Sequence, residues 1–359
     1  MIVAPQAIRE ITSDWLTVVL KSADLIRSSK VVGAVPTVLS ENRGFLSVVA
    51  KFALSYDEPE PTAPNTVVVK METPDPELHM IGDEKHAFER EIKFYQEVGQ
   101  RTGIRLPSVY FAVDQPPHFC LVMEDFSHCE PGDQVAGMPL DLVGTAAQMM
   151  GTLQARFWNN EALELLNWMP TSNRIEADYE ENWTSFKKHY GHFIEKGGIE
   201  LGDHLLSYID WVFEEIEHRP KTITHNDLRE DNLLFGKAGT NEEVIIIDWQ
   251  LATRSMGVFD ITRLISGSTL PDLRRGHEIE ILRIWYDSLI RGGVEGYSWE
   301  DARYDLHLAL LECICYPIKF HTAFIDKPHE GRGYQLTEAI IRRHFASAVD
   351  LNAAEILPG

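Results

Sequence analysis

The residues best suited to chemistry lie in one stretch, THNDLREDNLLFGKAGTNEEVIIIDWQ, which runs from Thr224 to Gln250. It carries two carboxylates, Asp227 and Asp248, and the amide of Asn232. Carboxylate and amide oxygens are the hard ligands that Mg²⁺ prefers. A carboxylate beside such a metal can orient an acceptor hydroxyl and take its proton, so the three residues suit phosphoryl transfer.

The elements around these residues are predicted to bring them together. Residues 233–235 and 244–247 are apolar and strand-like, and the intervening GKAGTNEE has the Gly and Asn content of a turn. In such a hairpin Asn232 and Asp248 lie at the same open end, although 16 residues separate them. Asp227 lies on the loop just before the first strand. We therefore expect Asp227 to be the catalytic base, and Asn232 and Asp248 to hold Mg²⁺.

The combination of these residues is more informative than each residue alone. Singly, an Asp or Asn in a turn more often caps a helix or makes an Asx turn. The five-residue spacing from Asp227 to Asn232 is that of a kinase catalytic loop. The pattern HxDxxxxN, followed by IIIDWQ and GVFDITRLI, resembles the aminoglycoside phosphotransferase and choline kinase superfamily, and most closely its ecdysteroid-kinase-like branch. The resemblance extends from Lys70 to about Arg263.

The resemblance also implies residues that bind the nucleotide. Lys70, at the end of TVVV, matches the lysine that contacts the ATP phosphates in this family. Glu91 matches the glutamate that aims this lysine, while Glu89 lies on another helical face and is the weaker candidate. LVMEDF resembles the hinge between lobes, where backbone groups would hold adenine. The expected adenine contacts are at Glu124, Asp125 and Phe126.

The sequence departs from the family pattern in two places. The loop that covers the phosphates is expected at Ser40–Ser47, but that stretch has Gly44 as its only glycine and no GxGxxG. The helix matching GTLQARFW has Gln154 where family members commonly carry a histidine. The role of that histidine is therefore not transferred to this chain.

Three further polar residues in the catalytic stretch or near it have expected roles. By the resemblance, His225 supports the catalytic loop through hydrogen bonds, and Asp260 anchors the loop from the helical part of the chain. Arg229 has two open roles: it reaches the transferring phosphoryl group, or it pairs with Glu230 on the surface.

The wider pattern predicts an α+β, two-lobed, protein-kinase-like fold. A chain of 359 residues exceeds the size at which one core stops growing. After a helix near Thr12, the first third has strand-like runs at 45–56 and 66–72, a helix at 85–99 and two more strand-like runs. Beyond residue 125 helical periodicity dominates. We expect a small nucleotide-binding lobe with one antiparallel sheet and a packed helix at 1–124, and a larger helical lobe for catalysis and acceptor binding at 125–359.

Composition narrows the possible partners. The formal net charge is -22, which repels a nucleic-acid backbone. No apolar run reaches the length of about 18 residues that spans a bilayer, and no secretory signal is evident, so neither nucleic acid nor membrane is an expected partner. The four cysteines form no CxxC pair, which favours reduced thiols in the cytoplasm.

The predicted activity is ATP- and Mg²⁺-dependent phosphorylation of a hydroxyl on a small organic acceptor. The resemblance favours a steroid-like acceptor, while the acidic charge favours a cation such as an aminoglycoside or choline. The acceptor, the choice between ATP and GTP, and the oligomeric state stay open. Tyr316–Phe324 is expected to break at Pro317; like the aromatic-rich Phe157–Phe193, it either lines the acceptor pocket or packs in the core.

Other classes of function also stay open. The alternatives are a catalytically inactive nucleotide-binding pseudokinase or scaffold, and an enzyme that transfers a nucleotidyl group. A protein substrate is less expected, because Asp248 is followed by Trp-Gln instead of Phe-Gly and no APE sequence follows.

Overall fold

The computed structural model describes residues 2–39, 46–76, 79–80, 82, 86–115, 118–171, 178–237, 244–321 and 330–358. Nearly all of the expected phosphate-covering loop, and the turn of the predicted hairpin, lie outside these residues. The chain forms two compact units. The sheet unit comprises Met1–Arg101, Arg105–Glu130 and Ile247–Leu251, and the helical unit comprises Thr102–Ile104, Pro131–Ile246 and Ala252–Gly359.

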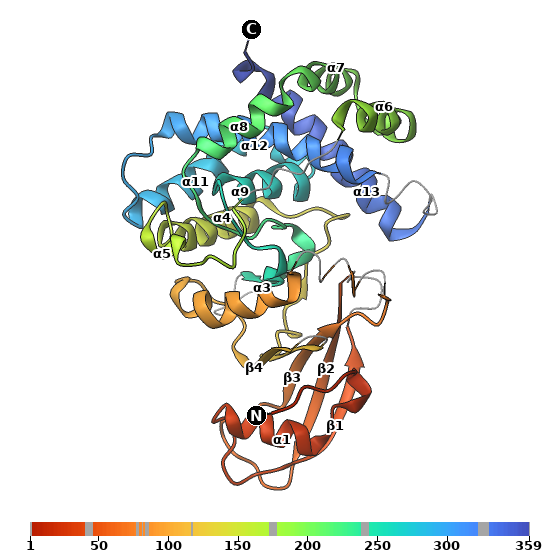
Figure 1. Cartoon of the computed structure of the whole chain (residues 1–359), viewed down its shortest axis with the longest axis vertical. Helices are drawn as coiled ribbons and strands as arrows, with labels where there is room; N and C mark the ends of the chain where they lie inside the picture. Colours follow the sequence, from red (N-terminus) through yellow and green to blue (C-terminus); the bar gives the residue numbers. More distant parts are fainter. Residues whose placement is uncertain are drawn as a thin grey trace. The chain divides into compact units, whose positions relative to one another are not determined.

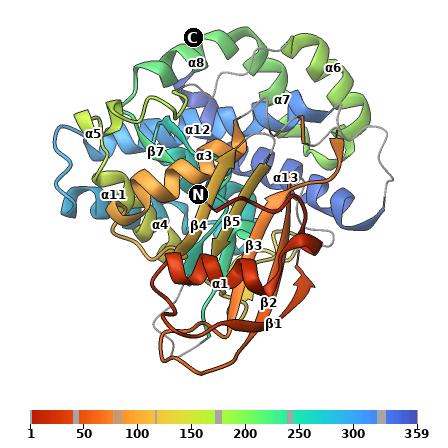
Figure 2. The same cartoon turned by 60° about the horizontal axis from the view of Figure 1, so that its bottom comes forward.

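The sheet unit is built on five antiparallel strands in the order β1-β2-β3-β5-β4 (Figure 1). The strands are β1 (Val31–Val38), β2 (Ser47–Tyr56), β3 (Thr66–Glu72), β4 (Val109–Gln115) and β5 (His118–Met123). Helix α1 (Ser13–Ser22) begins after Thr12, whose hydroxyl accepts a hydrogen bond from the Trp15 backbone N–H at 3.1 Å, as the sequence predicts for an N-cap. The helix lies across the strands in Figure 2.

The two faces of β3 have different neighbours. Successive side chains of a strand point to opposite faces, so Val67 and Val69 share one face and Lys70 lies on the other. Val67 and Val69 belong to the hydrophobic core that includes Leu16 and Val19 of α1. Lys70 is therefore on the face away from α1, although β3 is the central strand and Lys70 is buried.

Helix α3 (Ala87–Lys93), which runs on into a π-helical turn at Phe94–Val98, packs against β4, β5 and the short turn Trp249–Leu251. The ring of Phe94 stacks on that of Trp249, with centroids 3.9 Å apart and planes 7° from parallel. Trp249 is fully buried. This stack joins a segment from late in the sequence to the sheet unit.

The helical unit contains most of the long helices. They are α4 (Leu140–Ala155), α6 (Tyr179–Tyr190), α7 (Lys196–Leu205), α8 (Ile209–His218), α9 (Val258–Arg263), α11 (Glu278–Arg291), α12 (Trp299–Phe320) and α13 (Gly331–Asp350), with short α5 (Glu161–Glu164) and α10 (Pro271–Arg274). Two small sheets interrupt them. One pairs β7 (Thr222–Thr224) with β10 (Thr253–Ser255), antiparallel. The other has the order β6 (Glu130–Pro131), β8 (Leu233–Phe235) and β9 (Val244–Ile246), in which β8 and β9 are antiparallel.

Buried aromatic rings form part of the core of the helical unit. Trp183 and Phe186 of α6 stack on Phe345 of α13, with centroids 5.9 Å and 6.1 Å apart respectively. Gly202 of α7 lies against the Trp183 ring and leaves no room for a Cβ there. This part of the expected aromatic tract therefore packs in the core.

The structure confirms the predicted α+β class, with an antiparallel N-terminal sheet and a mostly helical C-terminal part. One prediction is wrong: α12 does not break at Pro317 but continues to Phe320. Buried residues on both sides of the proline, such as Cys315 and Ile318, hold the helix in place. The division of labour between residues 1–124 and 125–359 stays a prediction.

Within the described residues, no helix is both long and apolar enough to cross a membrane. All four cysteines are buried, and none of them forms a disulfide.

Candidate active site

Lys70 lies between two carboxylates in the sheet unit. Its Nζ is 2.7 Å from Glu91 Oε2 and 2.7 Å from Asp248 Oδ1. Burial alone would lower the pKa of the lysine, but the charges of Asp248 and Glu91 outweigh burial and raise it. Glu89 lies elsewhere, at the surface beside Lys93. The lysine is therefore firmly charged and held in one position, which is what aiming at a phosphate requires.

Asp248 has an unusual backbone conformation. Its φ is 67°, in the left-handed region that a residue with a Cβ rarely adopts. The next residue, Trp249, is fixed by its stack on Phe94, so packing holds the strained position. Oδ2 of Asp248 accepts a bond from Gln250 Nε2 at 3.4 Å. Strain of this kind clusters at functional sites, which agrees with the role expected for Asp248.

The three expected adenine contacts follow β5. Met123, the last residue of β5, pairs with Val68 of β3, so Glu124 is the first residue beyond the end of β5. The Glu124 carboxylate contacts Arg105 at 2.5 Å, and the Asp125 carboxylate accepts from the Ser127 N–H at 2.7 Å. The side chains of both acids are thus turned toward neighbouring residues. The Glu124 backbone N–H also donates within the protein, to the Ser108 carbonyl at 2.9 Å. The assignment of the adenine contacts to the backbone here stays a prediction.

In the helical unit, the loop that carries Asp227 is held by hydrogen bonds to Asp260 of α9. Oδ2 of Asp260 accepts from the His225 backbone N–H at 2.9 Å, and Oδ1 accepts from the Asn226 N–H at 3.0 Å. Asn226 has a φ of 65°, so the loop also turns through the left-handed region here. Burial raises the pKa of Asp260, while His225 and the loop N–H groups act in the opposite direction. Asp260 therefore makes the contacts that the sequence analysis predicted for a residue that anchors the catalytic loop.

Gln154 of α4 supports the same anchor. Its Nε2 donates to Asp260 Oδ2 at 3.2 Å and to the Gly257 carbonyl at 3.0 Å, and its Oε1 accepts from Trp285 Nε1 at 2.6 Å. Both polar atoms of the amide are therefore hydrogen-bonded inside a buried network. The residue that departs from the family pattern thus holds the loop in place.

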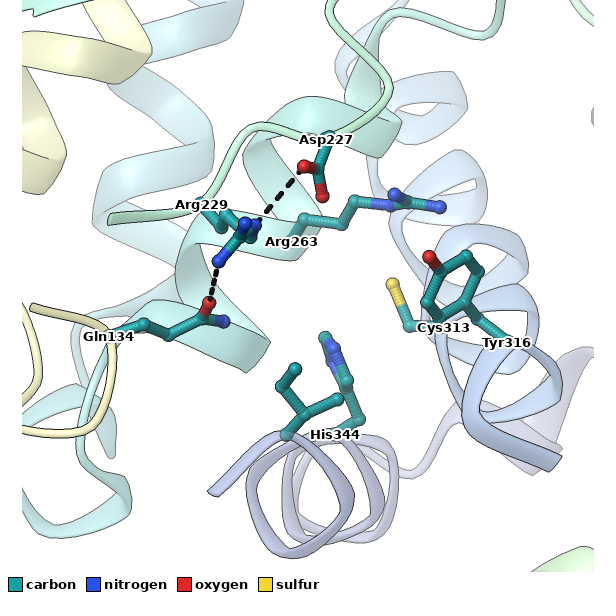
Figure 3. A pocket seen from close by; sticks show the side chains of 8 residues that line it. Gln134, Asp227, Arg229, Arg263, Cys313, Tyr316 and His344 are labelled. Carbon is teal, nitrogen blue, oxygen red and sulfur yellow. Dashed lines mark hydrogen bonds and ion pairs between the residues drawn. The ribbon is translucent and has the colours of Figure 1, made fainter. Parts of the chain in front are cut away.

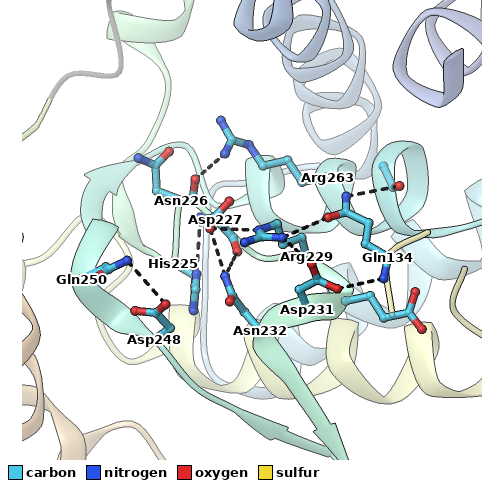
Figure 4. Close-up of polar contacts among 12 residues, drawn as sticks. Gln134, His225, Asn226, Asp227, Arg229, Asp231, Asn232, Asp248, Gln250 and Arg263 are labelled. Carbon is cyan, nitrogen blue, oxygen red and sulfur yellow. Dashed lines mark hydrogen bonds and ion pairs between the residues drawn. The ribbon is translucent and has the colours of Figure 1, made fainter. Parts of the chain in front are cut away.

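The two oxygens of Asp227 differ in their surroundings (Figure 4). Oδ2 accepts from Asn232 Nδ2 at 3.0 Å and from Arg229 Nε at 3.1 Å. Oδ1 accepts no hydrogen bond from any residue that the structure describes. The Asp227 backbone N–H donates to His225 Nδ1 at 3.3 Å, so the imidazole of His225 supports the loop. One carboxylate oxygen is held still and the other is available to a ligand.

Asn232 has a defined orientation that fits a cation. Its Nδ2 also donates to the Asp227 carbonyl at 2.8 Å, and a carbonyl can only accept, so the amide cannot be reversed. Within the described part of the chain Oδ1 of Asn232 is left without a hydrogen-bond donor. Leu233 pairs with Ile246, so Asn232 and Ile247 leave the β8–β9 hairpin at the same end. An amide oxygen without a donor is a suitable Mg²⁺ ligand.

Arg229 links Asp227 to a chain of charges that the sequence did not indicate. Besides Asp227, it contacts Asp231 Oδ2 at 2.8 Å through Nη1. Oδ1 of Asp231 in turn contacts Arg332 of α13 at 2.7 Å. One of the two roles expected for Arg229 was pairing with Glu230 on the surface. That prediction is wrong, because Glu230 is buried. The contacts span about a hundred residues of sequence, which is why no local pattern revealed them.

A cavity of about 40 Å³ opens beside Asp227 within the helical unit (Figure 3). Its lining residues come from five separate segments. They are Gln134, Asp227, Arg229, Arg263, Cys313, Tyr316, Ile340 and His344. Of these, the sequence pointed to Asp227, Arg229 and the segment of Tyr316. Arg263 had one usable signal, its place in the stretch GVFDITRLI three residues after Asp260.

Comparison with known proteins supports a kinase-like family. A family model described as the ecdysteroid kinase-like family matches residues 158–292. No curated protein matches the sequence.

Several solved structures are similar over most of their length. Choline kinase LicA from Streptococcus pneumoniae is 13% identical, with 92% of this chain and 98% of that chain covered and a TM-score of 0.47. Macrolide 2'-phosphotransferase MphH from Brachybacterium faecium is 11% identical, with 91% and 98% covered and a TM-score of 0.48. At TM-scores below 0.5 these likenesses carry no argument about chemistry. The matched region, residues 158–292, contains the HxDxxxxN pattern, and the model that matches it is that of the branch which the pattern resembles.

Proposed function

We propose that this protein transfers the γ-phosphoryl group of ATP to a hydroxyl of a small organic acceptor. One observation carries the proposal. Oδ2 of Asp227 is held by Asn232 and Arg229, while Oδ1 has no donor among the described residues and Asp227 lines a cavity. A fixed carboxylate with one available oxygen is the group that a hydroxyl needs as its base.

In the proposed reaction Asp227 orients the acceptor hydroxyl and takes its proton. The hydroxyl oxygen forms a bond to the γ-phosphorus, the bond from that phosphorus to the bridging oxygen breaks, and ADP leaves with the electron pair. Most of the catalysis in such a transfer comes from positioning and charge. The loop bonds from Asp260 and His225 supply the positioning of Asp227.

Lys70, held by Glu91, would position the nucleotide phosphates. Asn232 and Asp248 would hold Mg²⁺, which when bound offsets the charge of the phosphates. Two protein ligands suffice, because Mg²⁺ in such sites keeps waters and phosphate oxygens as its other ligands. The adenine is expected at the backbone of Glu124, Asp125 and Phe126. Four buried cysteines without a disulfide fit a reducing compartment such as the cytoplasm.

The test is acceptor-stimulated release of ADP from Mg-ATP, with Asp227→Asn measured in parallel. Asp287→Asn, which alters an exposed carboxylate of α11, is the matched control. We expect stimulated turnover in the native protein and the control and a loss of more than about a hundredfold in Asp227→Asn. Undiminished turnover in that variant would overturn the assignment of the base. Release of pyrophosphate instead of ADP would indicate nucleotidyl transfer.

A non-catalytic role has one supporting observation. Asp227 and Lys70 are both ion-paired within the protein, Asp227 with Arg229 and Lys70 with Asp248. A pseudokinase would bind the nucleotide and release no ADP with any acceptor. Titration of ATP followed by the turnover assay distinguishes the two functions.

A further inference from the structure

The hydroxyl group of Tyr95 is buried in the sheet unit without a hydrogen-bond partner. Tyr95 is only 8% exposed, and its hydroxyl oxygen meets no donor or acceptor among the residues that the structure describes. Buried tyrosines usually place this group against a partner, because an unpaired buried donor is unfavourable. Tyr95 also lies in the π-helical turn Phe94–Val98, and such turns are frequent at functional sites. The hydroxyl is therefore examined for a partner that it gains in another state of the protein.

Two carboxylates of the candidate active site act on this hydroxyl. Glu91 comes about one helical turn before Tyr95. Asp248 precedes Trp249, whose ring stacks on that of Phe94, the residue before Tyr95. Burial and the negative charges of Glu91 and Asp248 raise the pKa of Tyr95 well above its ordinary value, with Glu91 having the larger effect of the two. Tyr95 is therefore a neutral hydroxyl that can donate, close to Glu91.

Glu91 is the carboxylate that lacks a second donor. It is 1% exposed, and Lys70 is its one side-chain partner in the described part of the chain. Asp248 is better supplied, because Lys70 binds Oδ1 and Gln250 donates to Oδ2 at 3.4 Å (Figure 4). Burial, together with the charge of Asp248, raises the pKa of Glu91 against the opposite effect of Lys70. One cluster thus holds an unpaired donor and a carboxylate that has a single donor.

The nucleotide of the proposed function would change the contacts of Lys70. At present this one lysine serves two carboxylates, Glu91 and Asp248, at 2.7 Å each. Phosphate oxygens compete for the same ammonium group, which has three donors in all. When the lysine turns toward them, its contact with Glu91 weakens. A buried carboxylate that loses its donor is strongly disfavoured, so Glu91 then needs a replacement.

We propose, building on the function proposed above, that Tyr95 is a positioning residue for the nucleotide phosphates: its hydroxyl donates to Glu91 when Lys70 turns toward them. The Tyr95 ring packs edge-on against Phe94, with centroids 5.7 Å apart and planes at 79°, so the ring stays in place and the Glu91 carboxylate turns. The hydroxyl would hold Glu91 while the lysine serves the phosphates.

Tyr95→Phe removes the hydroxyl and keeps the ring. Calorimetry with the full chain compares the binding of ADP, whose phosphates engage Lys70, with that of adenosine, which has none. We expect Tyr95→Phe to weaken ADP binding about tenfold and to leave adenosine binding unchanged. The Tm of the ligand-free variant should be unchanged or higher, because the hydroxyl that is lost has no partner in that state. Equal ADP affinities for the native protein and the variant, or an equal loss for ADP and adenosine, overturn the inference.

Tyr297→Phe is the matched control. Tyr297 is also buried, but its hydroxyl donates to Asp305 Oδ2 at 2.8 Å in the helical unit. Removing this satisfied hydroxyl should lower the Tm by about 2–4 °C and leave the ADP affinity unchanged. The two tyrosines are therefore expected to behave in opposite ways.

A second measurement needs no nucleotide. Lys70→Met removes the lysine from Glu91, so in this background the hydroxyl of Tyr95 should already donate to Glu91. Adding Tyr95→Phe should then lower the Tm by about 2–4 °C, although the same change alone does not. A folded Lys70→Met protein whose Tm is unchanged by Tyr95→Phe refutes the role of the hydroxyl.

Turnover separates this inference from the function beneath it. Weaker ADP binding by Tyr95→Phe, without acceptor-stimulated ADP release from Mg-ATP by the native protein, would remove the proposed kinase activity and leave the role of Tyr95 standing. Stimulated ADP release by the native protein, with an ADP affinity that Tyr95→Phe leaves unchanged, would do the reverse.

Discussion

Replacing Asp260 by Asn tests whether this carboxylate anchors the catalytic loop. The substitution keeps the size of the side chain but leaves one oxygen where there were two. In the native protein one oxygen accepts from Asn226 and the other accepts from His225 and Gln154. If the Asn keeps its oxygen toward His225 and Gln154, its NH₂ group faces the Asn226 N–H, and two donors oppose each other. The reverse orientation loses two bonds instead of one.

Two contributions of opposite sign decide the magnitude. An unpaired buried donor costs about 1–3 kcal/mol, and the two retained bonds each lose roughly 1 kcal/mol with the charge. Removing a buried charge recovers part of this, because burial disfavours the ionised carboxyl and raises its pKa. We expect a net destabilisation of the loop of about 2 kcal/mol, which corresponds to a roughly 30-fold higher opening equilibrium.

Native-state hydrogen exchange at the amides of His225 and Asn226 measures this opening directly. We expect their exchange to accelerate about 30-fold in Asp260→Asn, and turnover to fall by up to about a hundredfold because Asp227 is displaced. Asp272→Asn, at an almost fully exposed carboxylate of α10, is the control. Unchanged exchange at both amides with undiminished turnover would refute the anchoring argument.

Three further predictions concern other parts of the helical unit. Arg332→Ala removes the contact with Asp231 that steadies Arg229, so kcat should fall about threefold to tenfold, with the affinity for ATP unchanged in titration. His344 keeps a pKa of about 3 when folded and regains about 6.5 when unfolded, so stability falls as pH drops below about 6.5. His344→Gln should remove up to about 1.4 kcal/mol per pH unit from that fall in urea unfolding. Gly202→Ala forces a methyl group into a buried ring and should cost about 1–3 kcal/mol by thermal unfolding.

Each of these has its own control. Arg332→Lys should have a kcat between those of Arg332→Ala and the native protein. Native activity in Arg332→Ala would show that the contact is dispensable. For the histidine, an identical pH slope in the variant would contradict the argument. Gly333→Ala, at an exposed site of α13 with open space around it, should be neutral or slightly stabilising, whereas a loss there equal to that of Gly202→Ala would remove the packing explanation.

Much of the sheet unit could be predicted because its strands are apolar, strand-like runs and the segments between them are rich in Pro and acidic residues. β1 was not predicted, since Gly33 and Pro36 are unfavourable inside strands. The structure places β1 at the edge of the sheet, where a proline is tolerated. α13 was missed for a related reason. Arg343 and His344 are buried on it, so its core-facing side does not appear apolar in the sequence.

The candidate site was predictable only where spacing along the chain fixes the geometry. The five residues from Asp227 to Asn232 lie in one loop, and the two side chains do meet. Arg332 and Asp231 are 101 residues apart, and nothing in the local sequence of either indicates the other. The lining of the cavity is of this second kind, because it comes from five separate segments of the chain.

The sheet unit cannot be completed during synthesis until the segment Ile247–Leu251 has been made. Lys70 and Asp248 are 178 residues apart, yet both belong to that unit. A ribosome that adds about 5–20 residues per second makes Asp248 roughly ten to forty seconds after Lys70. During that interval the nascent sheet has neither the second carboxylate for its lysine nor the tryptophan that stacks on Phe94. The N-terminal part of the chain must therefore wait, incomplete and accessible to chaperones, until about half of the helical unit has been translated.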